Sequence, residues 1–78
     1  GFAASWISLA EFYTTGEVVG KDVEKAIEYF SLASDHGLGE ADYLLAKIYE
    51  SEEGYIDPVK QSQCLTRSVG RGYQPEEG

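Results

Sequence analysis

The segment KDVEKAIEYFSLASDHG, residues 21–37, decides the fold class of this chain. Its apolar residues recur at the spacing of one helix face, at Val23, Ala26, Ile27, Phe30 and Ala33. Asp22 stands at the N-cap position, where a carboxylate accepts hydrogen bonds from the first N–H groups of a helix. Gly37 stands at the end, since glycine adopts positive φ without a steric clash. The segment predicts a helix over residues 22–36.

Three further segments carry helix patterns, at about residues 2–14, 40–50 and 58–70. In the first, one face is formed by Ser5, Leu9, Phe12 and Tyr13, and Gly16 follows as a stop. In the second, the corresponding face is formed by Ala41, Leu45, Ile48 and Tyr49. The third opens with Asp57 as a cap and Pro58 at the first helical position. Because short loops join the helices, we expect an all-α fold of two antiparallel helix hairpins.

The two predicted hairpins align with each other in sequence. A shift of 36 positions places Ser5, Leu9, Ala10 and Tyr13 on Ala41, Leu45, Ala46 and Tyr49. A shift of 35 places Asp22, Lys25 and Gly37 on Asp57, Lys60 and Gly72. Helix pairs that recur at a period in the mid-thirties are typical of an α-solenoid. We expect one hairpin in residues 1–37, with Gly1 matching the end of a preceding repeat, a degenerate hairpin in 38–72, and a tail or the start of a further repeat in 73–78.

The repeated pattern resembles a known family. Small-x-x-x-Leu-[Gly/Ala]-x-x-Tyr, a glycine-bearing loop, Asp-x-x-Lys-Ala-x-x-Tyr-Phe and Ala-Ser-x-x-Gly together resemble the Sel-one-like repeat (SLR), a relative of the tetratricopeptide repeat (TPR). Residues 5–37 match nearly throughout, whereas the second copy matches well over 41–49 and poorly afterwards. The resemblance implies an α/α solenoid, a fragment of a longer array, that acts as a protein-interaction scaffold or adaptor.

The repeat predicts which residues pack the helices together. Small residues allow close helix approach and large ones fill the space between layers. The expected packing residues are Leu9, Ala10, Tyr13, Ala26, Phe30, Ala33, Leu45, Ala46, Ile48 and Tyr49.

The resemblance also implies a partner-binding surface on the first helix of each hairpin. Its expected residues, which point away from the predicted packing face, are Ile7, Glu11, Thr14, Tyr43, Lys47 and Glu50. Ile7 and Tyr43 would be apolar anchors surrounded by charge, a common composition of binding hot spots. The alternative is that Ile7 and Tyr43 pack against adjacent repeats.

The last predicted helix departs from its counterpart. Ala26, Ile27, Tyr29 and Ala33 are replaced there by Gln61, Ser62, Cys64 and Ser68. An apolar stripe remains at Val59, Leu65 and Val69. Because terminal solenoid repeats need a polar outer face, we interpret this helix as a degenerate or capping element. At the other end, Phe2, Trp6 and Ile7 suit a preceding repeat or a second molecule.

Composition argues against several functions. The 78 residues carry 14 acidic and 6 basic side chains, a net charge of −8, with no basic stripe for nucleic acid. This charge favours solubility or attracts basic partners. No apolar run approaches the roughly 20 residues of a membrane span. One His and one Cys give no zinc spacing, and the acidic loop with Glu50, Glu52, Glu53 and Asp57 lacks the calcium-loop pattern.

No enzymatic activity is expected. Ser34, Asp35 and His36 have the residue types of a hydrolase triad, but adjacent helical residues diverge by about 100° and do not converge on one site. We therefore predict a non-enzymatic scaffold without a cofactor, with a protein or peptide as its partner. One alternative is a structural spacer that self-associates through exposed repeat ends. A second alternative is an accessory domain of a larger enzyme.

Overall fold

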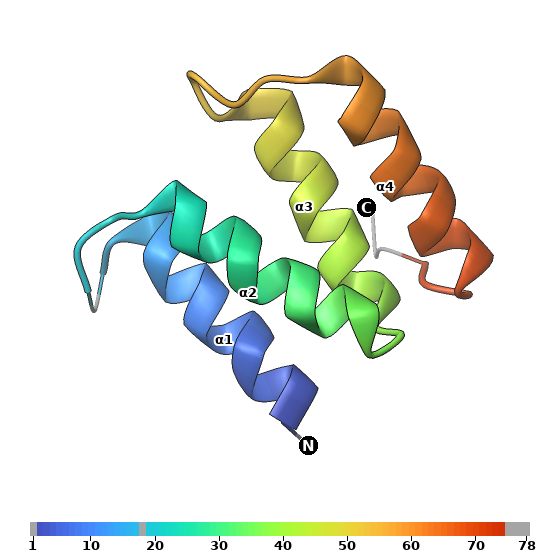
Figure 1. The fold of residues 1–78 in the computed structure, drawn as a ribbon, viewed down its shortest axis with the longest axis horizontal. Helices are drawn as coiled ribbons and strands as arrows, with labels where there is room; N and C mark the ends of the chain where they lie inside the picture. Colours follow the sequence, from blue (N-terminus) through green and yellow to red (C-terminus); the bar gives the residue numbers. More distant parts are fainter. Residues whose placement is uncertain (1, 18, 75–78) are drawn as a thin grey trace.

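The computed structural model describes residues 2–17 and 19–74. These residues form four α-helices and no strand: α1 (Phe2–Thr15), α2 (Val23–Asp35), α3 (Gly39–Ser51) and α4 (Pro58–Gly70) (Figure 1). Each boundary lies within one residue of the range predicted from sequence. The prediction of an all-α fold with four helices is confirmed.

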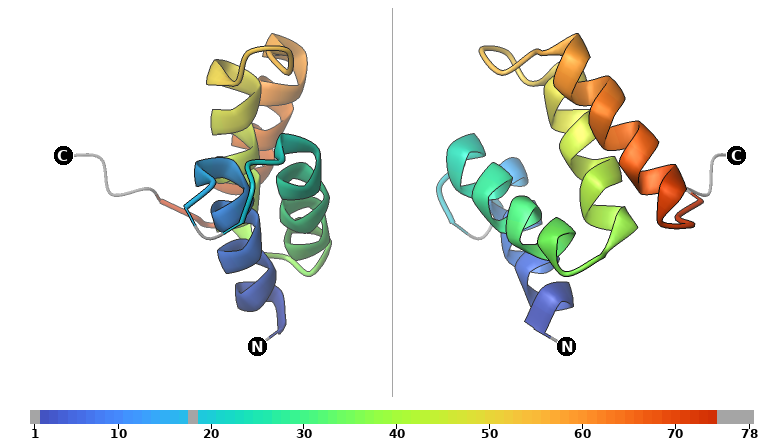
Figure 2. Two further views of the ribbon diagram at one scale, coloured as in Figure 1. Left: turned by 90° about the vertical axis from the view of Figure 1, so that its left-hand side faces the viewer. Right: turned by 45° about the vertical axis from the view of Figure 1, so that its right-hand side comes forward.

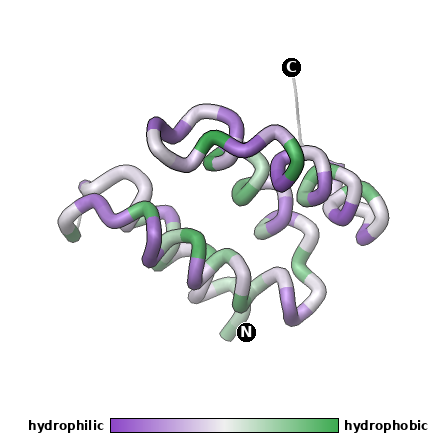
Figure 3. The backbone as a smooth tube through the Cα atoms, turned by 45° about the horizontal axis from the view of Figure 1, so that its top comes forward, coloured by the Kyte–Doolittle hydropathy of each residue, from purple (hydrophilic) through white to green (hydrophobic). Residues whose placement is uncertain are grey.

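The helices pack in chain order, α1 against α2, α2 against α3 and α3 against α4. Figure 1 shows two antiparallel hairpins side by side, and Figure 2 shows the same pairing from two further directions. Hydrophobic positions recur between hydrophilic ones along the helices (Figure 3). Such amphipathic helices bury one face each, and a helix with neighbours on two sides buries more.

The second helix of each hairpin starts with the same hydrogen bonds. The backbone N–H of Asp22 donates to the carbonyl of Tyr13 at 2.9 Å, and that of Asp57 donates to the carbonyl of Tyr49 at 2.9 Å. Each aspartate carboxylate accepts the N–H three residues further on at 3.1 Å. These are N-cap bonds, which satisfy donors that a helix start leaves open.

Both second helices also end in the same way. Gly37 and Gly72 adopt positive φ angles of 89° and 83°. The residue after each glycine donates its N–H back to the last helical turn, at 3.2 Å from Leu38 and 3.1 Å from Tyr73. This is the pattern of a left-handed C-terminal cap. The two hairpins are therefore built on equivalent local geometry.

The core lies between the four helices. Its buried apolar residues are Ile7, Ala10, Ala26, Phe30, Ala33, Ala41, Leu45, Ala46, Ile48 and Cys64. Tyr13 and Tyr49, which were also expected to pack, are half-buried against it. Alanines at positions 10, 26, 33, 41 and 46 are all almost fully buried, which is consistent with close helix approach.

The predicted packing face of α1 is wrong. Ser5, Leu9 and Phe12 are exposed, Leu9 to 40%, whereas Ile7 and Ala10 are buried. The cause is the position of α1 at the edge of the row. α2 covers the side that contains Ala10, and among the described residues nothing buries the side that contains Leu9.

The apolar residues predicted to form one stripe on α4 are exposed rather than packed against α3. Val59 and Val69 are 65% and 71% exposed, whereas Cys64 and Ser68 are buried. The Ser68 hydroxyl donates to the Gly39 carbonyl at 2.9 Å, so a small polar residue packs at the contact with α3. The outer face of α4 is mixed, because Ser62, Gln63 and Thr66 are exposed together with the two valines, and the interpretation of α4 as a degenerate or capping element stays a prediction.

Candidate functional site

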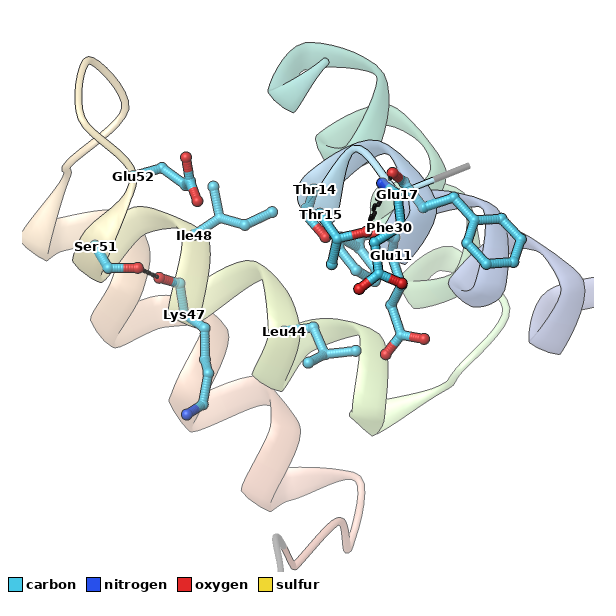
Figure 4. A pocket seen from close by; sticks show the side chains of 11 residues that line it. Glu11, Thr14, Thr15, Glu17, Phe30, Leu44, Lys47, Ile48, Ser51 and Glu52 are labelled. Atoms are coloured by element: carbon cyan, nitrogen blue, oxygen red, sulfur yellow. Dashed lines mark hydrogen bonds between the residues drawn. The ribbon is translucent and has the colours of Figure 1, made fainter. Parts of the chain in front are cut away.

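A hollow of about 410 Å³ lies between the first helices of the two hairpins. Its lining comes from α1, α2, α3 and the loops that follow α1 and α3: Glu11, Phe12, Thr14, Thr15, Glu17, Phe30, Leu44, Lys47, Ile48, Ser51 and Glu52. Figure 4 shows Leu44 and Ile48 projecting from α3 toward α1, where Glu11 and Thr14 lie opposite. We call this hollow the α1/α3 groove.

The floor of the α1/α3 groove is apolar. Phe30 of α2 and Ile48 of α3 are buried, and Leu44 is half-buried beside them. Phe30 is positioned by the amphipathic pattern of α2, which directs its large side chain between the two hairpins. Apolar side chains of this kind, set in a hollow with polar edges, favour an apolar group from a partner.

The rim of the groove is mainly acidic. Glu11 and Glu17 come from α1 and its loop, and Glu52 caps the end of α3. Glu52 forms an ion pair with Lys21 at 3.2 Å. Lys47 is the basic member of the lining, and its Nζ lies 5.3 Å from the centre of the Tyr43 ring. The rim therefore attracts cationic groups more strongly than anionic ones.

The residues predicted to bind a partner fall into three places. Glu11, Thr14 and Lys47 line the α1/α3 groove. Tyr43 and Glu50, again with Lys47, line a second hollow of about 290 Å³ whose other lining residues are Ala46, Gln61 and Leu65. Ile7 lines neither of these hollows.

The prediction that Ile7 is displayed to a partner is wrong. Ile7 is buried, because it lies on the side of α1 that packs into the core. The alternative, that Ile7 and Tyr43 pack against adjacent repeats, stays a prediction. Tyr43 is half-buried, and its ring centre lies 5.5 Å from that of Tyr73, so it contacts the segment after α4.

Sequence reasoning placed Phe30 and Ile48 in the packing set and overlooked Leu44, Glu17 and Glu52 as groove residues. A signal for Leu44 was present, because it stands one helical turn before Ile48. Glu17 and Glu52 lie outside the four helices, so no helix pattern predicts where their side chains lie. Only the approach of two loop segments brings them to one rim.

A buried polar cluster was also missed. Asp42 is fully buried; it accepts the Ser34 hydroxyl at 2.6 Å and Arg71 Nη1 at 2.9 Å. Arg71 also donates to the Ser34 carbonyl, and Arg67 Nε lies 3.7 Å from the Asp42 carboxylate. The cluster joins α2, α3 and the end of α4. In sequence Asp42 aligns with Trp6, a residue that was assigned to an outer surface, so the pattern did not predict this burial.

The Ser34–Asp42–Arg71 cluster is structural in character. Within the described part of the chain, every buried side-chain nitrogen or oxygen has a hydrogen-bond partner. A buried carboxylate is tolerated when it is paired and hydrogen-bonded in this way. Ser34, Asp42 and Arg71 line neither the α1/α3 groove nor the second hollow.

Reactive and metal-binding chemistry finds little support in the geometry. Burial raises the pKa of the Cys64 thiol, and a protonated thiol is a poor nucleophile. His36 lies at the end of α2, with Nδ1 3.1 Å from the Leu32 carbonyl and its ring against Trp6. Across residues 2–17 and 19–74, no three His, Cys, Asp or Glu side chains gather as metal ligands. No helix in the same residues has the length and apolar character needed to cross a membrane.

No family model, no curated protein and no solved structure matches this chain.

Proposed function

We propose that this chain is a protein-interaction scaffold without enzymatic activity, built as an α/α solenoid segment of the SLR type. Its partner segment binds in the α1/α3 groove. The observation that carries the proposal is the hollow between the first helices of the two hairpins, with an apolar floor and an acidic rim. Further support comes from the two equivalent hairpins, whose capping bonds repeat at the spacing found in the sequence.

The groove suits a partner segment with one large apolar side chain flanked by basic residues. The apolar anchor would lie over Phe30, Leu44 and Ile48, where its burial releases water from apolar surface. Basic flanking groups would lie near Glu11 and Glu17 on the rim. Charges of this kind mainly increase the association rate and the selectivity, whereas the buried anchor supplies most of the affinity.

A non-enzymatic role is supported by the chemistry of the groove lining. Its ionisable groups are carboxylates and one lysine, and its hydroxyl groups belong to Thr14, Thr15 and Ser51. The hydroxyls of Thr14 and Ser51 donate to helix carbonyls, at Glu11 and Lys47. Hydroxyls that are held in local backbone bonds lack the adjacent base that activates a nucleophile.

Fluorescence anisotropy with two labelled peptides tests the proposal. Both peptides carry a central Leu-Leu-Phe segment; lysines flank it in one and glutamates in the other. The lysine peptide is expected to bind at least about tenfold more tightly, and to lose affinity as salt is raised. Equal affinity for the two peptides, or no binding of either, would contradict the proposed groove.

A matched pair of variants locates the binding site. Leu44→Glu places a charge over the groove floor and is expected to weaken binding of the lysine peptide by at least about tenfold. Ile56→Glu introduces the same charge at an exposed apolar residue outside the groove and should bind like the wild type. Because added negative charge alone would attract the lysine peptide, weaker binding by Leu44→Glu reports loss of the anchor site.

A further inference from the structure

One exposed face of α1 is mainly apolar and consists of Phe2, Ser5, Leu9 and Phe12, of which Phe12 also lines the α1/α3 groove; we call this face the α1 outer stripe. All of its members are exposed, including Phe2 and Phe12. They stand at i, i+3, i+7 and i+10, so they form one continuous helix face. Apolar residues aligned along one exposed helix face differ from scattered surface apolar residues and indicate a contact surface.

The second hairpin shows what covers this stripe when a neighbour is present. The residues of α3 and its N-cap equivalent to the α1 outer stripe are Leu38, Ala41, Leu45 and Ile48. Leu38 is half-buried and the other three are buried. α4 contacts the adjacent side of α3 through Asp42 and Tyr49. α2 also packs against α3, where Ser34 bonds to Asp42 and Phe30 lines the α1/α3 groove beside Ile48.

α4 exposes the residues that are equivalent to one face of α2. Val23, Ile27, Phe30 and Ser34 lie along one face of α2, from which Ser34 bonds to Asp42 of α3 and Phe30 lines the α1/α3 groove beside Ile48. Their equivalents on α4 are Pro58, Ser62, Leu65 and Val69, which we call the α4 outer stripe. All four are exposed. α4 thus exposes residues equivalent to a face of α2, the helix that packs on α3, whereas the α1 outer stripe has no such helix against it in the described residues.

A matched exchange of residues supports contact between the two stripes. At the internal α2–α3 contact, Ser34 donates to Asp42 at 2.6 Å. The equivalents of these two residues are Val69 on α4 and Trp6 on α1, and Trp6 lies beside the α1 outer stripe, half-buried against His36. A polar pair inside the molecule therefore corresponds to an apolar pair at its two ends. Had one member alone changed, a polar group would face an apolar one at a cost in desolvation.

Charge favours the same contact. α1 contains one charged residue, Glu11, whereas α4 contains Lys60 and Arg67 and no acidic residue. In a chain with a net charge of −8, two whole copies repel each other, but these two helices carry opposite signs. Lys60 and Arg67 lie near Tyr49 and Asp42 of α3, so this charge disfavours contact between two α4 ends without placing an ion pair across the two stripes.

We propose that the α1 outer stripe binds the α4 outer stripe of a second copy, head to tail, and repeats the packing of α2 on α3. The contact is heterologous, so association extends beyond a dimer. It involves one face of one helix on each side and is therefore smaller than the roughly 1,200 Å² of a stable interface. Association is weak and becomes visible as the protein concentration rises.

Sedimentation velocity over a concentration series tests this contact. The wild type is expected to show a mass that rises with concentration past that of a dimer. Leu9→Glu alters the α1 outer stripe and Val69→Glu alters the α4 outer stripe, and each should remain monomeric at the same concentrations. Ile56→Glu, an equally exposed apolar residue outside both stripes, is the matched control and should associate like the wild type. Circular dichroism confirms that each variant is folded.

A mixture of Leu9→Glu and Val69→Glu gives the decisive result. Each variant keeps one intact stripe, so the mixture should form a 1:1 dimer that grows no further. A wild-type protein that stays monomeric, or a mixture that stays monomeric, would overturn the proposal. Normal association of Val69→Glu would overturn it too, because that result indicates contact between two α1 ends. Phe12 belongs to both the α1 outer stripe and the α1/α3 groove, whereas neither Leu9 nor Val69 lines the groove, so both substitutions leave the groove lining itself unchanged.

Discussion

Leu9 of α1 and Leu45 of α3 occupy equivalent positions in the two hairpins, yet Leu9 is 40% exposed and Leu45 is 4% exposed. The local helix is the same in both cases, with the same loop hydrogen bonds at its end. What differs is the set of neighbours, since α3 packs against both α2 and α4, whereas α1 packs against α2. In a row of helices, burial depends on a residue's place in the row as well as on its own pattern.

The far ends of the hairpins differ in chemistry at equivalent positions. In the first, Trp6 contacts His36 with ring centres 4.8 Å apart. In the second, Asp42 and Arg71 form an ion pair at 2.9 Å. Each pair joins the first helix to the residue that ends the second helix. An aromatic contact in one hairpin and an ion pair in the other therefore occupy equivalent positions. In addition, Asp42 of the ion pair accepts a hydrogen bond from Ser34 of the first hairpin.

The largest expected effect tests the difference between Leu9 and Leu45. Leu45→Ala should lower the free energy of unfolding by about 3 kcal/mol, because it removes a buried side chain and leaves a cavity. Leu9→Ala should cost about 1 kcal/mol or less in monomeric protein, because the side chain is partly in water already. Urea denaturation of both variants at low concentration measures the difference. Equal losses would show that α1 and α3 do not differ as described.

A smaller effect is expected from the Asp42–Arg71 pair. Asp42→Asn keeps the shape but removes the charge that faces Arg71, and should cost about 2 kcal/mol. The cost is set below that of a fully buried pair because the Arg71 side chain is 30% exposed. Asp35→Asn, at an exposed carboxylate of α2, is the matched control and should change stability by less than about 0.5 kcal/mol.

A double-mutant cycle sharpens this prediction. Asp42→Asn and Arg71→Gln are combined, and their effects on unfolding are compared with those of the single variants. Coupled groups deviate from additivity by more than about 0.5 kcal/mol. Additive effects would mean that the ion pair contributes nothing to the contact between the hairpins.

The smallest effect concerns Cys64, which stands where the first hairpin has Tyr29. Tyr29 stacks on Tyr13 with ring centres 5.9 Å apart, whereas Cys64 is a small buried thiol. Burial raises the pKa of this thiol in the folded protein above its ordinary value. Its contribution to stability is therefore complete below the pKa of the unfolded thiol, about 8.5, and falls as the pH rises toward the folded value.

Urea denaturation between pH 7 and pH 10 measures this contribution. The wild type should lose stability over that interval because the unfolded thiol ionises first. In Cys64→Ala, the part of the loss that belongs to the thiol should be absent, and alkylation of wild-type Cys64 should track unfolding. Identical pH profiles for the wild type and Cys64→Ala would contradict a raised pKa at this site.

The parts of the fold that were predictable from sequence are local. Asp22 and Asp57 cap their helices, and Gly37 and Gly72 end them, because each feature depends on residues within a few positions of it. The bounds of α2 and α4 follow from these signals.

The candidate site was predictable in part. Glu11, Thr14 and Lys47 were assigned to a binding surface and line the α1/α3 groove. Ile7 was assigned to the same surface and is buried. The difference arises because periodicity identifies two faces of a helix without showing which one meets a neighbour. α1 carries apolar residues on both sides, so the sequence pattern alone favoured the wrong side.

By itself, the sequence determined the four helices, their boundaries and the equivalence of the two hairpins. These follow from hydrogen bonds and side-chain periodicity over one or two helical turns. The tertiary structure alone decided the burial of Asp42, the exposure of the two outer stripes, and the joining of Phe30, Leu44 and Glu17 in one groove. Those features depend on which helix faces lie together, and the packing of whole helices sets that arrangement.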